Sequence, residues 1–286
     1  MLKTYHTITD LQQILFLEKQ KNQSIGFVPT MGALHAGHLS LIETSNASSA
    51  KTVCSIFVNP TQFNDAQDYK KYPRDIEKDI ELLESAGCDF LFLPDEKEMY
   101  PDNKFKSIDF DPGELGLRLE GASRPGHFAG MTAVVKRLFD IVLPDKAFFG
   151  QKDYQQYLIV KKMVDYYHLP IEIIKCPIHR EPNGLAMSSR NERLAPELRQ
   201  EAALIHKTLT WIKEQVNRNG LNFEVIKSSA RAMLESNGNF TVDYIDICSA
   251  LDLKPATEDT KNLIALAAVN IGGVRLIDNV EISKGI

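Results

Sequence analysis

Short apolar runs alternate with amphipathic stretches along the first 178 residues of the chain. Five of these runs are rich in β-branched and aromatic residues and are bounded by Gly, Pro or Asn, which is typical of buried strands. They cover residues 25–30, 52–58, 89–94, 146–150 and 171–178. Helical patterns lie between them, at residues 35–49, 75–86, 129–142 and 153–168. Strand and helix in this order predict an α/β fold with a doubly wound, Rossmann-like parallel sheet.

The pattern changes after residue 178. Residues 197–218 contain no Gly or Pro and predict one long helix, and a second helix is expected at 223–235. Three strand-like runs follow, at residues 242–248, 263–269 and 274–282. They predict a smaller α+β domain, an antiparallel sheet backed by helices. We therefore expect two domains, 1–178 and 179–286, with the second as the candidate for a lid.

Composition narrows the class of protein. The 286 residues are 43% hydrophobic and 25% charged, with a net charge of -5, which allows a sizeable core. No Lys/Arg cluster predicts a nucleic acid or a membrane as partner, and no apolar run approaches the ~20 residues of a membrane span. Four separated cysteines without a CxxC pair predict reduced core thiols. With no signal-peptide pattern at the N-terminus, we expect a cytoplasmic location.

The strand at 25–30 leads through a turn into a helix with two histidines, within FVPTMGALHAGHLSLI. A spacing of three residues places the imidazoles of His35 and His38 on one face of the first helical turn. Unpaired backbone N–H groups and the helix dipole favour phosphate there, at the edge where open sheets bind ligands. The pattern predicts a phosphate site; a surface or capping role for the histidines is the alternative.

A polar segment, FVNPTQFN, follows the second strand. Asn59, Thr61 and Gln62 would offer neutral hydrogen-bonding groups at the same edge of the sheet. An ordinary turn is the alternative, because Asn-Pro commonly opens turns.

A third motif, FFGQKDYQQ, again runs from a strand through a glycine into a helix. Gly150 permits close approach of the backbone to a ligand, and Lys152 brings a compact cation to the helix start. Asp153 can cap the helix or bind a ribose hydroxyl or a metal, and Gln156 lies about one turn further. The alternative is an exposed ion pair between Lys152 and Asp153 with no role.

A fourth motif, REPNGLAMSSRN, lies where the second domain is expected to begin. Asn183-Gly184 predicts a turn, after which Ser188, Ser189 and Arg190 bring hydroxyls and a guanidinium together. Such groups suit a triphosphate. The alternative is an ordinary helix cap followed by an incidental arginine.

A Gly/Pro-rich segment, EGASRPGHFAGMTAVVKRLF, leads into the helix at 129–142. It carries Arg124 and His127 ahead of that helix. A surface loop without a role in the site is the alternative.

In their order and approximate spacing, these motifs resemble those of the pantoate–β-alanine ligases (pantothenate synthetases), within the HxGH/KMSKS-type nucleotidyltransferase superfamily. The resemblance spans most of the chain and includes Tyr72-Pro73-Arg74. It implies that the carboxylate of pantoate attacks the α-phosphate of ATP, releasing pyrophosphate and forming a bound pantoyl adenylate. The amine of β-alanine then attacks the acyl centre and expels AMP. The resemblance also implies Mg²⁺ on the phosphates and a homodimer.

The resemblance further implies roles for individual residues. The catalytic residues would be His35, His38, Lys152 and Arg190, with His38 as the proton donor, and Gln62 and Gln156 would bind pantoate. His179 would contact adenine through its backbone. The ATP-binding residues would be Met31, Gly32, Ala33, Leu34, His35, Ala36, Gly37, His38, Gly150, Gln151, Lys152, Asp153, His179, Met187, Ser188, Ser189 and Arg190.

The chain departs from the family pattern at two places. The family commonly has Gly and a Pro-containing segment after the equivalent of Gln62-Phe63, where this chain has Asn64-Asp65-Ala66-Gln67. His179 stands where an apolar residue is more usual. Neither departure removes an expected phosphate or pantoate ligand.

The residue types suit this chemistry on physical grounds. Attack of one anion on another requires that the phosphates be neutralised and the geometry fixed, for which Lys152, Arg190 and the helix termini supply positive field. Neutral glutamines suit an acid whose carboxylate must stay nucleophilic. The backbone N–H of Met31 could stabilise the oxyanion of the second step. A lid that excludes water is expected, because an acyl adenylate hydrolyses easily.

Two other functions stay open from the sequence. An adenylyltransferase that makes a dinucleotide shares HxGH but has no clear use for Gln62 and Gln156 together. A nucleotide-binding sensor without turnover could keep the same fold. The presence of His38, Lys152 and Arg190 argues against the sensor.

Overall fold

The computed structural model describes residues 1–63, 69–70, 72–219, 222–236 and 238–283. By its internal contacts the chain divides into two compact units. The first comprises Met1–Gly150 and Gln156–Cys176, and the second comprises Gln151–Gln155 and Pro177–Ile286. The departure from the family pattern at 64–67 lies outside the described residues.

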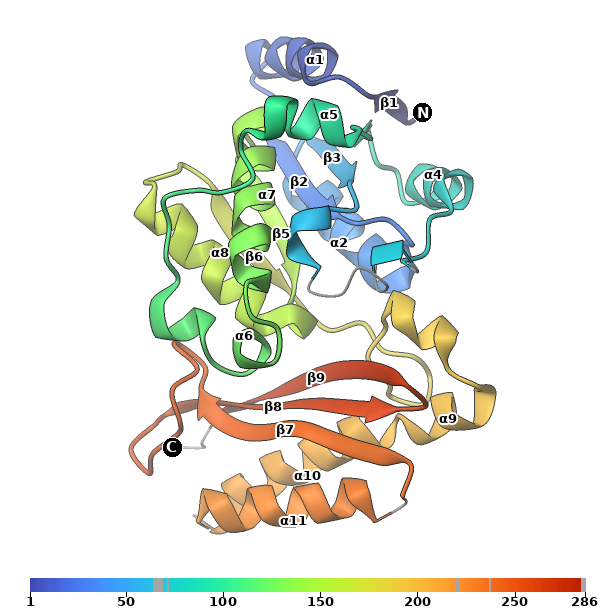
Figure 1. The fold of residues 1–286 in the computed structure, drawn as a ribbon. Helices are drawn as coiled ribbons and strands as arrows, with labels where there is room; N and C mark the ends of the chain where they lie inside the picture. Colours follow the sequence, from blue (N-terminus) through green and yellow to red (C-terminus); the bar gives the residue numbers. More distant parts are fainter. Residues whose placement is uncertain (64–68, 71, 220–221, 237, 284–286) are drawn as a thin grey trace. The chain divides into compact units, whose positions relative to one another are not determined.

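A six-stranded parallel sheet forms the centre of the first unit (Figure 1). Its strands are β1 (Lys3–Tyr5), β2 (Ile25–Thr30), β3 (Lys51–Ile56), β4 (Phe90–Phe92), β5 (Lys146–Gly150) and β6 (Glu172–Cys176). They are ordered β1-β4-β3-β2-β5-β6, and every pairing is parallel. The predicted doubly wound sheet is confirmed. The edge strand β1 escapes prediction because three residues carry too little periodicity.

Helices cover both faces of this sheet (Figure 1). Among the described residues they are α1 (Ile8–Gln20), α2 (Ala36–Ser48), α4 (Ile76–Ser85), α5 (Glu96–Met99), α6 (Glu120–Ser123), α7 (His127–Val142) and α8 (Tyr154–Tyr166). Three short 3₁₀ turns add to them: η1 (Pro60–Gln62), η2 (Pro101–Asn103) and η3 (Gly113–Gly116). The helices predicted between the strands are therefore present, and α1, α5 and α6 are additions to them.

Alternation along the strands sends apolar side chains to both helical layers. On β2, Phe27 packs in a core with residues of α1, α7 and α8, whereas Val28 packs in a second core with residues of α2 and α4. Burial on both faces explains why the strand reads as one apolar run. The chain proceeds from β2 towards β3 on one side, and β5 pairs on the other, so β2 lies at the switch point of the sheet. Ligands bind at such points, beyond the carboxyl ends of the strands.

The second unit has an antiparallel sheet in the order β7-β8-β9 with its own apolar core. Its strands are β7 (Phe240–Ser249), β8 (Asn262–Ile271) and β9 (Val274–Ser283). Its helices are α9 (Pro196–Glu201), α10 (Leu204–Asn219) and α11 (Phe223–Glu235), with 3₁₀ turns η4 (Gln151–Asp153) and η5 (Ser189–Arg193). The predicted antiparallel sheet backed by helices is confirmed.

The single long helix expected at 197–218 is wrong, because α9 ends before α10 begins. At the break, Ala203 N–H donates to Gln200 O and Ile205 N–H donates to Ala202 O, which are 3₁₀-type bonds. Ala202 and Ala203 are both buried at this point. Neither Gly nor Pro marks the break, so tertiary packing decides it.

Helix α7 crosses η1 at a glycine. A Cβ placed on Gly130 would lie 2.2 Å from the carbonyl oxygen of Thr61 and 2.9 Å from the backbone nitrogen of Gln62. Both atoms belong to backbone, which cannot swing aside as a flexible side chain can. Glycine thus lets α7 approach the segment that carries Gln62.

We predict that Gly130→Ala lowers the free energy of unfolding by about 1–3 kcal/mol, because the methyl group forces α7 away from Thr61. Chemical denaturation of both proteins measures the difference. The sign is diagnostic, since Ala in a helix without this clash would stabilise the protein by about 1 kcal/mol. A variant as stable as the wild type would contradict the proposed close approach.

Candidate active site

The turn after β2 is held by hydrogen bonds to the carboxylate of Asp79. Its Oδ2 accepts from the backbone N–H of Ala33 at 2.9 Å, and its Oδ1 accepts from that of Leu34 at 2.7 Å. Asp79 is 1% exposed, and burial raises the pKa of this carboxyl while the two N–H donors oppose the rise. The backbone is left-handed at Gly32 (φ 78°) and at Ala33 (φ 51°). The two hydrogen bonds therefore stabilise a turn that Ala33 adopts at a steric cost.

The two histidines of the turn lie together, as predicted, but only His38 lies within the helix. Helix α2 begins at Ala36, and His35 is its extended N-cap, with φ −146° and ψ 174°. The prediction that His35 lies inside the helix is wrong, because its Nδ1 instead accepts from Gly37 N–H at 3.1 Å. An acceptor at Nδ1 places the proton of the neutral ring on Nε2. The ring centroids of His35 and His38 are 4.1 Å apart.

Gln62 reaches the same turn from η1. It is buried, and its Nε2 lies 2.8 Å from Met31 Sδ. The first unit thus brings together the Met31 turn, the histidine pair that follows it and one of the two expected pantoate ligands. Gln156 lies in the first turn of α8, half-buried, and no hydrogen bond among the described residues joins it to Gln62.

In the second unit, Asn279 of β9 holds the segment that carries Lys152. Its Nδ2 donates to the carbonyl oxygens of Gln151 (2.9 Å) and Lys152 (3.0 Å), and its Oδ1 accepts from Gln151 Nε2 at 3.2 Å. Lys152 Nζ lies 3.6 Å from Asp153 Oδ2, and the side chains are 19% and 49% exposed. The ion pair considered as an alternative therefore exists, with the ammonium as its more buried member. A Cβ on Gly150 would meet nothing within 4 Å, so no crowding by described residues requires glycine there.

The segment of the fourth motif folds back on itself. Met187 N–H donates to His179 O at 3.0 Å, and the predicted turn at Asn183-Gly184 is confirmed, with Gly184 at φ 97°. Ser188 caps η5 by accepting from Arg190 N–H at 3.3 Å. The capping role considered for this serine is thus observed. Ser189 and Arg190 lie in the 3₁₀ turn η5, and Met187 and Ser188 directly precede it.

Asp278, the neighbour of Asn279 on β9, anchors this fold-back. It is buried and accepts from Arg180 at both oxygens, with Nη1–Oδ2 at 2.7 Å and Nη2–Oδ1 at 3.0 Å. Adjacent residues of one strand therefore hold both of the expected nucleotide segments of the second unit. Sequence reasoning missed this pair and Asp79. The available signals were the Asp-Asn step within the apolar strand at 274–282, and an acid in the first turn of the helix at 75–86.

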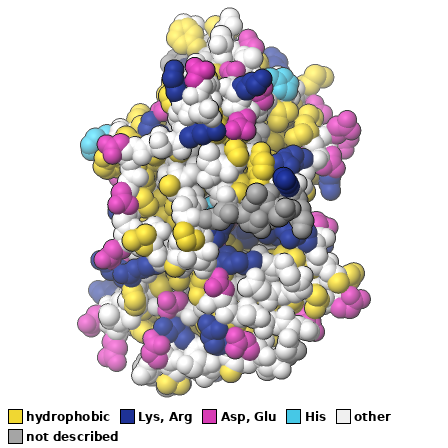
Figure 2. Space-filling view, viewed as in Figure 1, with side chains coloured by type: hydrophobic (Ala, Val, Ile, Leu, Met, Phe, Trp, Pro, Cys, Tyr) yellow, Lys and Arg dark blue, Asp and Glu magenta, His cyan; other side chains and the backbone are white. Residues whose placement is uncertain are grey.

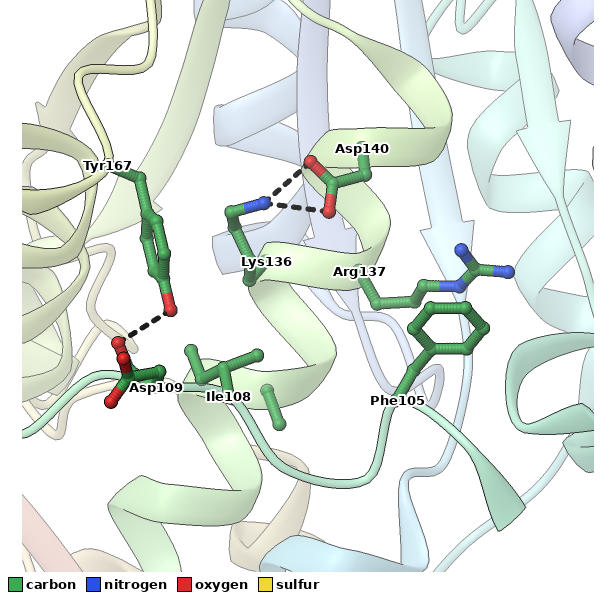
Figure 3. Close-up of a pocket in the computed structure, with 8 residues that line it drawn as sticks. Phe105, Ile108, Asp109, Lys136, Arg137, Asp140 and Tyr167 are labelled. Carbon is green, nitrogen blue, oxygen red and sulfur yellow. Dashed lines mark hydrogen bonds and ion pairs between the residues drawn. The ribbon is translucent and has the colours of Figure 1, made fainter. Parts of the chain in front are cut away.

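A cavity of about 130 Å³ lies elsewhere in the first unit, beside α7 (Figure 3). Its cations are already engaged: Lys136 Nζ contacts both oxygens of Asp140 at 2.7 Å, and Arg137 lies over the ring of Phe105, 4.0 Å from its centroid. None of the expected site residues lines this cavity. A second cavity of about 200 Å³ adjoins the turn, with Met31, Gly32 and Asp79 in its wall.

The face seen in Figure 2 has acidic and basic side chains interspersed over most of its area. No helix among the described residues has the length and apolar character needed to cross a membrane. All four cysteines, Cys54, Cys88, Cys176 and Cys248, are buried, as predicted. In the described part of the chain, no three His, Cys, Asp or Glu side chains cluster as a metal site would need.

Comparison with known proteins is in accord with this architecture. The family model for pantoate-beta-alanine ligase matches residues 3–281. A pantothenate synthetase of Cytophaga hutchinsonii is 46% identical over 282 residues, covering 96% of this chain and 99% of its own. The crystal structure of pantothenate synthetase from Thermus thermophilus superposes with a TM-score of 0.90 at 40% identity, covering 97% of this chain and 98% of that one.

A further solved structure is the pantoate-beta-alanine ligase of Francisella tularensis, complexed with beta-gamma ATP and beta-alanine. It superposes with a TM-score of 0.79 at 36% identity, covering 98% of this chain and 97% of that one. These matches extend over nearly the whole length of this chain and of each relative. The resemblance inferred from the motifs is confirmed, and the chain belongs to the pantoate–β-alanine ligase family.

Proposed function

We propose that this protein condenses pantoate with β-alanine at the expense of ATP, giving pantothenate, AMP and pyrophosphate through a bound pantoyl adenylate. The observation that carries the proposal is the family match over residues 3–281. The Francisella tularensis relative, complexed with beta-gamma ATP and beta-alanine, supports two of the three substrates.

In the first step, the carboxylate of pantoate attacks the α-phosphate of ATP. Repulsion between the two anions is the main barrier, so the site must neutralise phosphate charge and hold the reactants in line. His35 can donate from Nε2, because its Nδ1 is occupied by the Gly37 N–H. His38 is the proposed proton donor to the phosphates, and the N-terminus of α2 adds its own positive field. Positioning of two reactants can contribute about 7–11 kcal/mol to such a step.

Lys152 and Arg190 are proposed to act on the same ATP. Lys152 is a compact ammonium whose backbone is fixed by Asn279, and Arg190 follows the serine cap of η5. The proposed ATP contacts otherwise come from backbone and small side chains. They are Met31, Gly32, Ala33, Leu34, Ala36, Gly37, Gly150, Gln151, Asp153, His179, Met187, Ser188 and Ser189.

Gln62 and Gln156 are proposed to bind pantoate through neutral amides. A tight pair with arginine would lower the nucleophilicity of the pantoate carboxylate, whereas an amide orients it without neutralising it. In the second step, the backbone N–H of Met31 would stabilise the oxyanion formed when β-alanine attacks the acyl centre. The second unit is the proposed lid that protects the adenylate from water.

Mg²⁺ is proposed to enter with ATP, since this ion usually keeps several waters and binds through substrate phosphates and one or two carboxylates. When bound, it would neutralise phosphate charge. The described residues fit this mode better than an all-protein cage, because they contain no cluster of three potential ligands.

The resemblance to the family also supports a homodimer, and the buried thiols support the cytoplasm as location. Sedimentation would test the dimer.

We predict pyrophosphate–ATP isotope exchange that requires pantoate and proceeds without β-alanine, because the bound adenylate can react with labelled pyrophosphate to re-form ATP and pantoate. Labelled pyrophosphate and the wild-type protein measure it. Exchange supported only by a phosphorylated acceptor would instead favour an adenylyltransferase that makes a dinucleotide. Binding of ATP without any exchange would favour the sensor.

We predict that His38→Ala and Lys152→Ala each lower this exchange by about 100- to 1000-fold, the usual effect of removing a group that stabilises developing charge. Circular dichroism and thermal unfolding check that both variants fold. Lys136→Ala is a matched control, because it removes a lysine held in an ion pair with Asp140 beside the separate cavity. Exchange at the wild-type rate in the two site variants would refute their roles.

We predict that Asp79→Asn raises the KM for ATP, because an amide NH₂ would then face one of the two backbone N–H donors of the turn. The unsatisfied group also lowers the free energy of unfolding by about 1–3 kcal/mol. Asp89→Asn is the matched control: Asp89 accepts from Thr52 N–H at 2.9 Å, at the amino end of β3. Both variants should lose stability, and an unchanged KM for ATP in Asp79→Asn would contradict the role given to the turn.

A further inference from the structure

The amide of Gln62 can present either its oxygen or its NH₂ to a ligand, and the buried groups around it determine which. The two ends of an amide have nearly the same shape, so only hydrogen-bond partners distinguish them. Backbone groups serve as fixed references, since an N–H only donates and a carbonyl only accepts. Asn59, at the N-cap of η1, forms hydrogen bonds both with such backbone groups and with the Gln62 side chain.

Backbone partners fix the orientation of the Asn59 amide. Its oxygen is the acceptor for Thr61 N–H at 3.3 Å, and its Nδ2 donates to Gly130 O at 3.2 Å. The same Nδ2 lies 3.2 Å from the Gln62 side chain. The Gln62 atom at that contact must accept, and it is therefore Oε1.

The NH₂ of Gln62 consequently points the other way, to Met31 Sδ at 2.8 Å. A thioether is a weak acceptor, so an oxygen of a ligand would make a better partner for this donor. The backbone of Gln62 is also held, because its carbonyl oxygen lies 2.8 Å from Nδ1 of the buried His127. A carbonyl can only accept, so the proton of His127 is on Nδ1.

Tyr100, which lies between α5 and η2, also contacts Asn59. It is 3% exposed, and its hydroxyl donates to Asn59 Oδ1 at 2.8 Å, shorter than the contacts from Thr61 to the same oxygen. Burial raises the pKa of Tyr100 to about 12, so the phenol stays protonated and remains a donor at neutral pH. The ring meets Phe57 edge-on, with centroids 5.9 Å apart, which limits its movement.

We infer that Tyr100 is a positioning residue which, through Asn59, holds the Gln62 amide with its NH₂ towards the acid substrate. The inference rests on the proposed function, in which Gln62 binds that substrate. It adds a rule of specificity: the acid must place a hydroxyl or carboxylate oxygen with a free lone pair opposite Gln62. A substrate that offers only a donor at this point meets another donor and is rejected.

The first test is Tyr100→Phe, which removes one hydroxyl and keeps the ring. We expect the KM for pantoate in the exchange reaction to rise about 3- to 10-fold, the effect of one net hydrogen bond, with the KM for ATP unchanged. Tyr167→Phe is the matched control, because the Tyr167 hydroxyl also donates at 2.8 Å, to Asp109 O beside the separate cavity (Figure 3). Equal KM values for pantoate in the two variants would overturn the inference.

A second variant, Asn59→Asp, replaces the NH₂ donor that faces Gln62 with an acceptor. A carboxylate oxygen would then face Gly130 O and Gln62 Oε1, so the Gln62 amide is driven to turn its oxygen towards the substrate. We expect a loss in kcat/KM for pantoate larger than that of Tyr100→Phe. A loss no larger than that of Tyr100→Phe would overturn the inference.

A double-mutant cycle separates action through Gln62 from a general structural effect. If Tyr100 acts through Gln62, Tyr100→Phe has no further effect on the KM for pantoate in a Gln62→Ala background. Independent, multiplying effects would overturn the inference while leaving the proposed function intact. Absence of pantoate-dependent exchange in the wild type would instead overturn both.

Discussion

Two hydrogen bonds from the turn after β2 to the carboxylate of Asp79 determine where helix α2 begins. Without them, the buried N–H of Leu34 and the part-buried N–H of Ala33 would lack this acceptor, and the left-handed conformation of Ala33 would lose its support. Because the turn is fixed, His35 occupies the N-cap position of α2. Its Nδ1 accepts from Gly37 N–H in the first turn of the helix, and its ring lies beside that of His38. The geometry of the histidine pair thus depends on an acid 44 residues further along than His35, on α4.

The same kind of support by a buried polar side chain recurs at the other segments proposed to bind the substrates. Asn59 accepts from Thr61 N–H in η1 and donates to Gly130 O in α7, and Asn279 secures the backbone that carries Lys152. In each case a buried polar side chain forms hydrogen bonds with backbone groups of the segment and of its neighbours, so the segment keeps one conformation. The proposed transfer of an adenylyl group would benefit from this rigidity, because groups already aimed at developing charge need no reorganisation during the reaction.

The two units solve this problem with different architectures. In the first, the carboxyl end of a central parallel strand opens at the switch point of the sheet, and a carboxylate from a flanking helix supports the turn. In the second, neighbouring residues Asp278 and Asn279 on an antiparallel strand reach two loops that are far apart in the sequence. The bidentate contact of buried Asp278 with Arg180 satisfies a carboxylate that would otherwise be costly to bury.

Most of the fold follows from local pattern. Strands such as β2, with both faces buried, and helices such as α11, with one apolar face, carry their periodicity in consecutive residues. The exceptions are elements whose cause is not local. The three-residue β1 is held by pairing with β4 and by packing of Tyr5 against the core, and the break between α9 and α10 reflects packing of Ala202 and Ala203.

The motifs alone identified the family and placed His38, Gln62 and Lys152 at the ends of strands or the starts of helices, because those residues lie within contiguous, characteristic segments. What only the tertiary structure decided is the set of supporting residues and the direction in which functional groups point. The capping of α2 by His35, the support from Asp79 and the orientation of the Gln62 amide each arise from contacts that folding creates. Hydrogen-bond partners distant in sequence leave no periodic trace, since a buried polar residue needs only one correctly placed acceptor or donor.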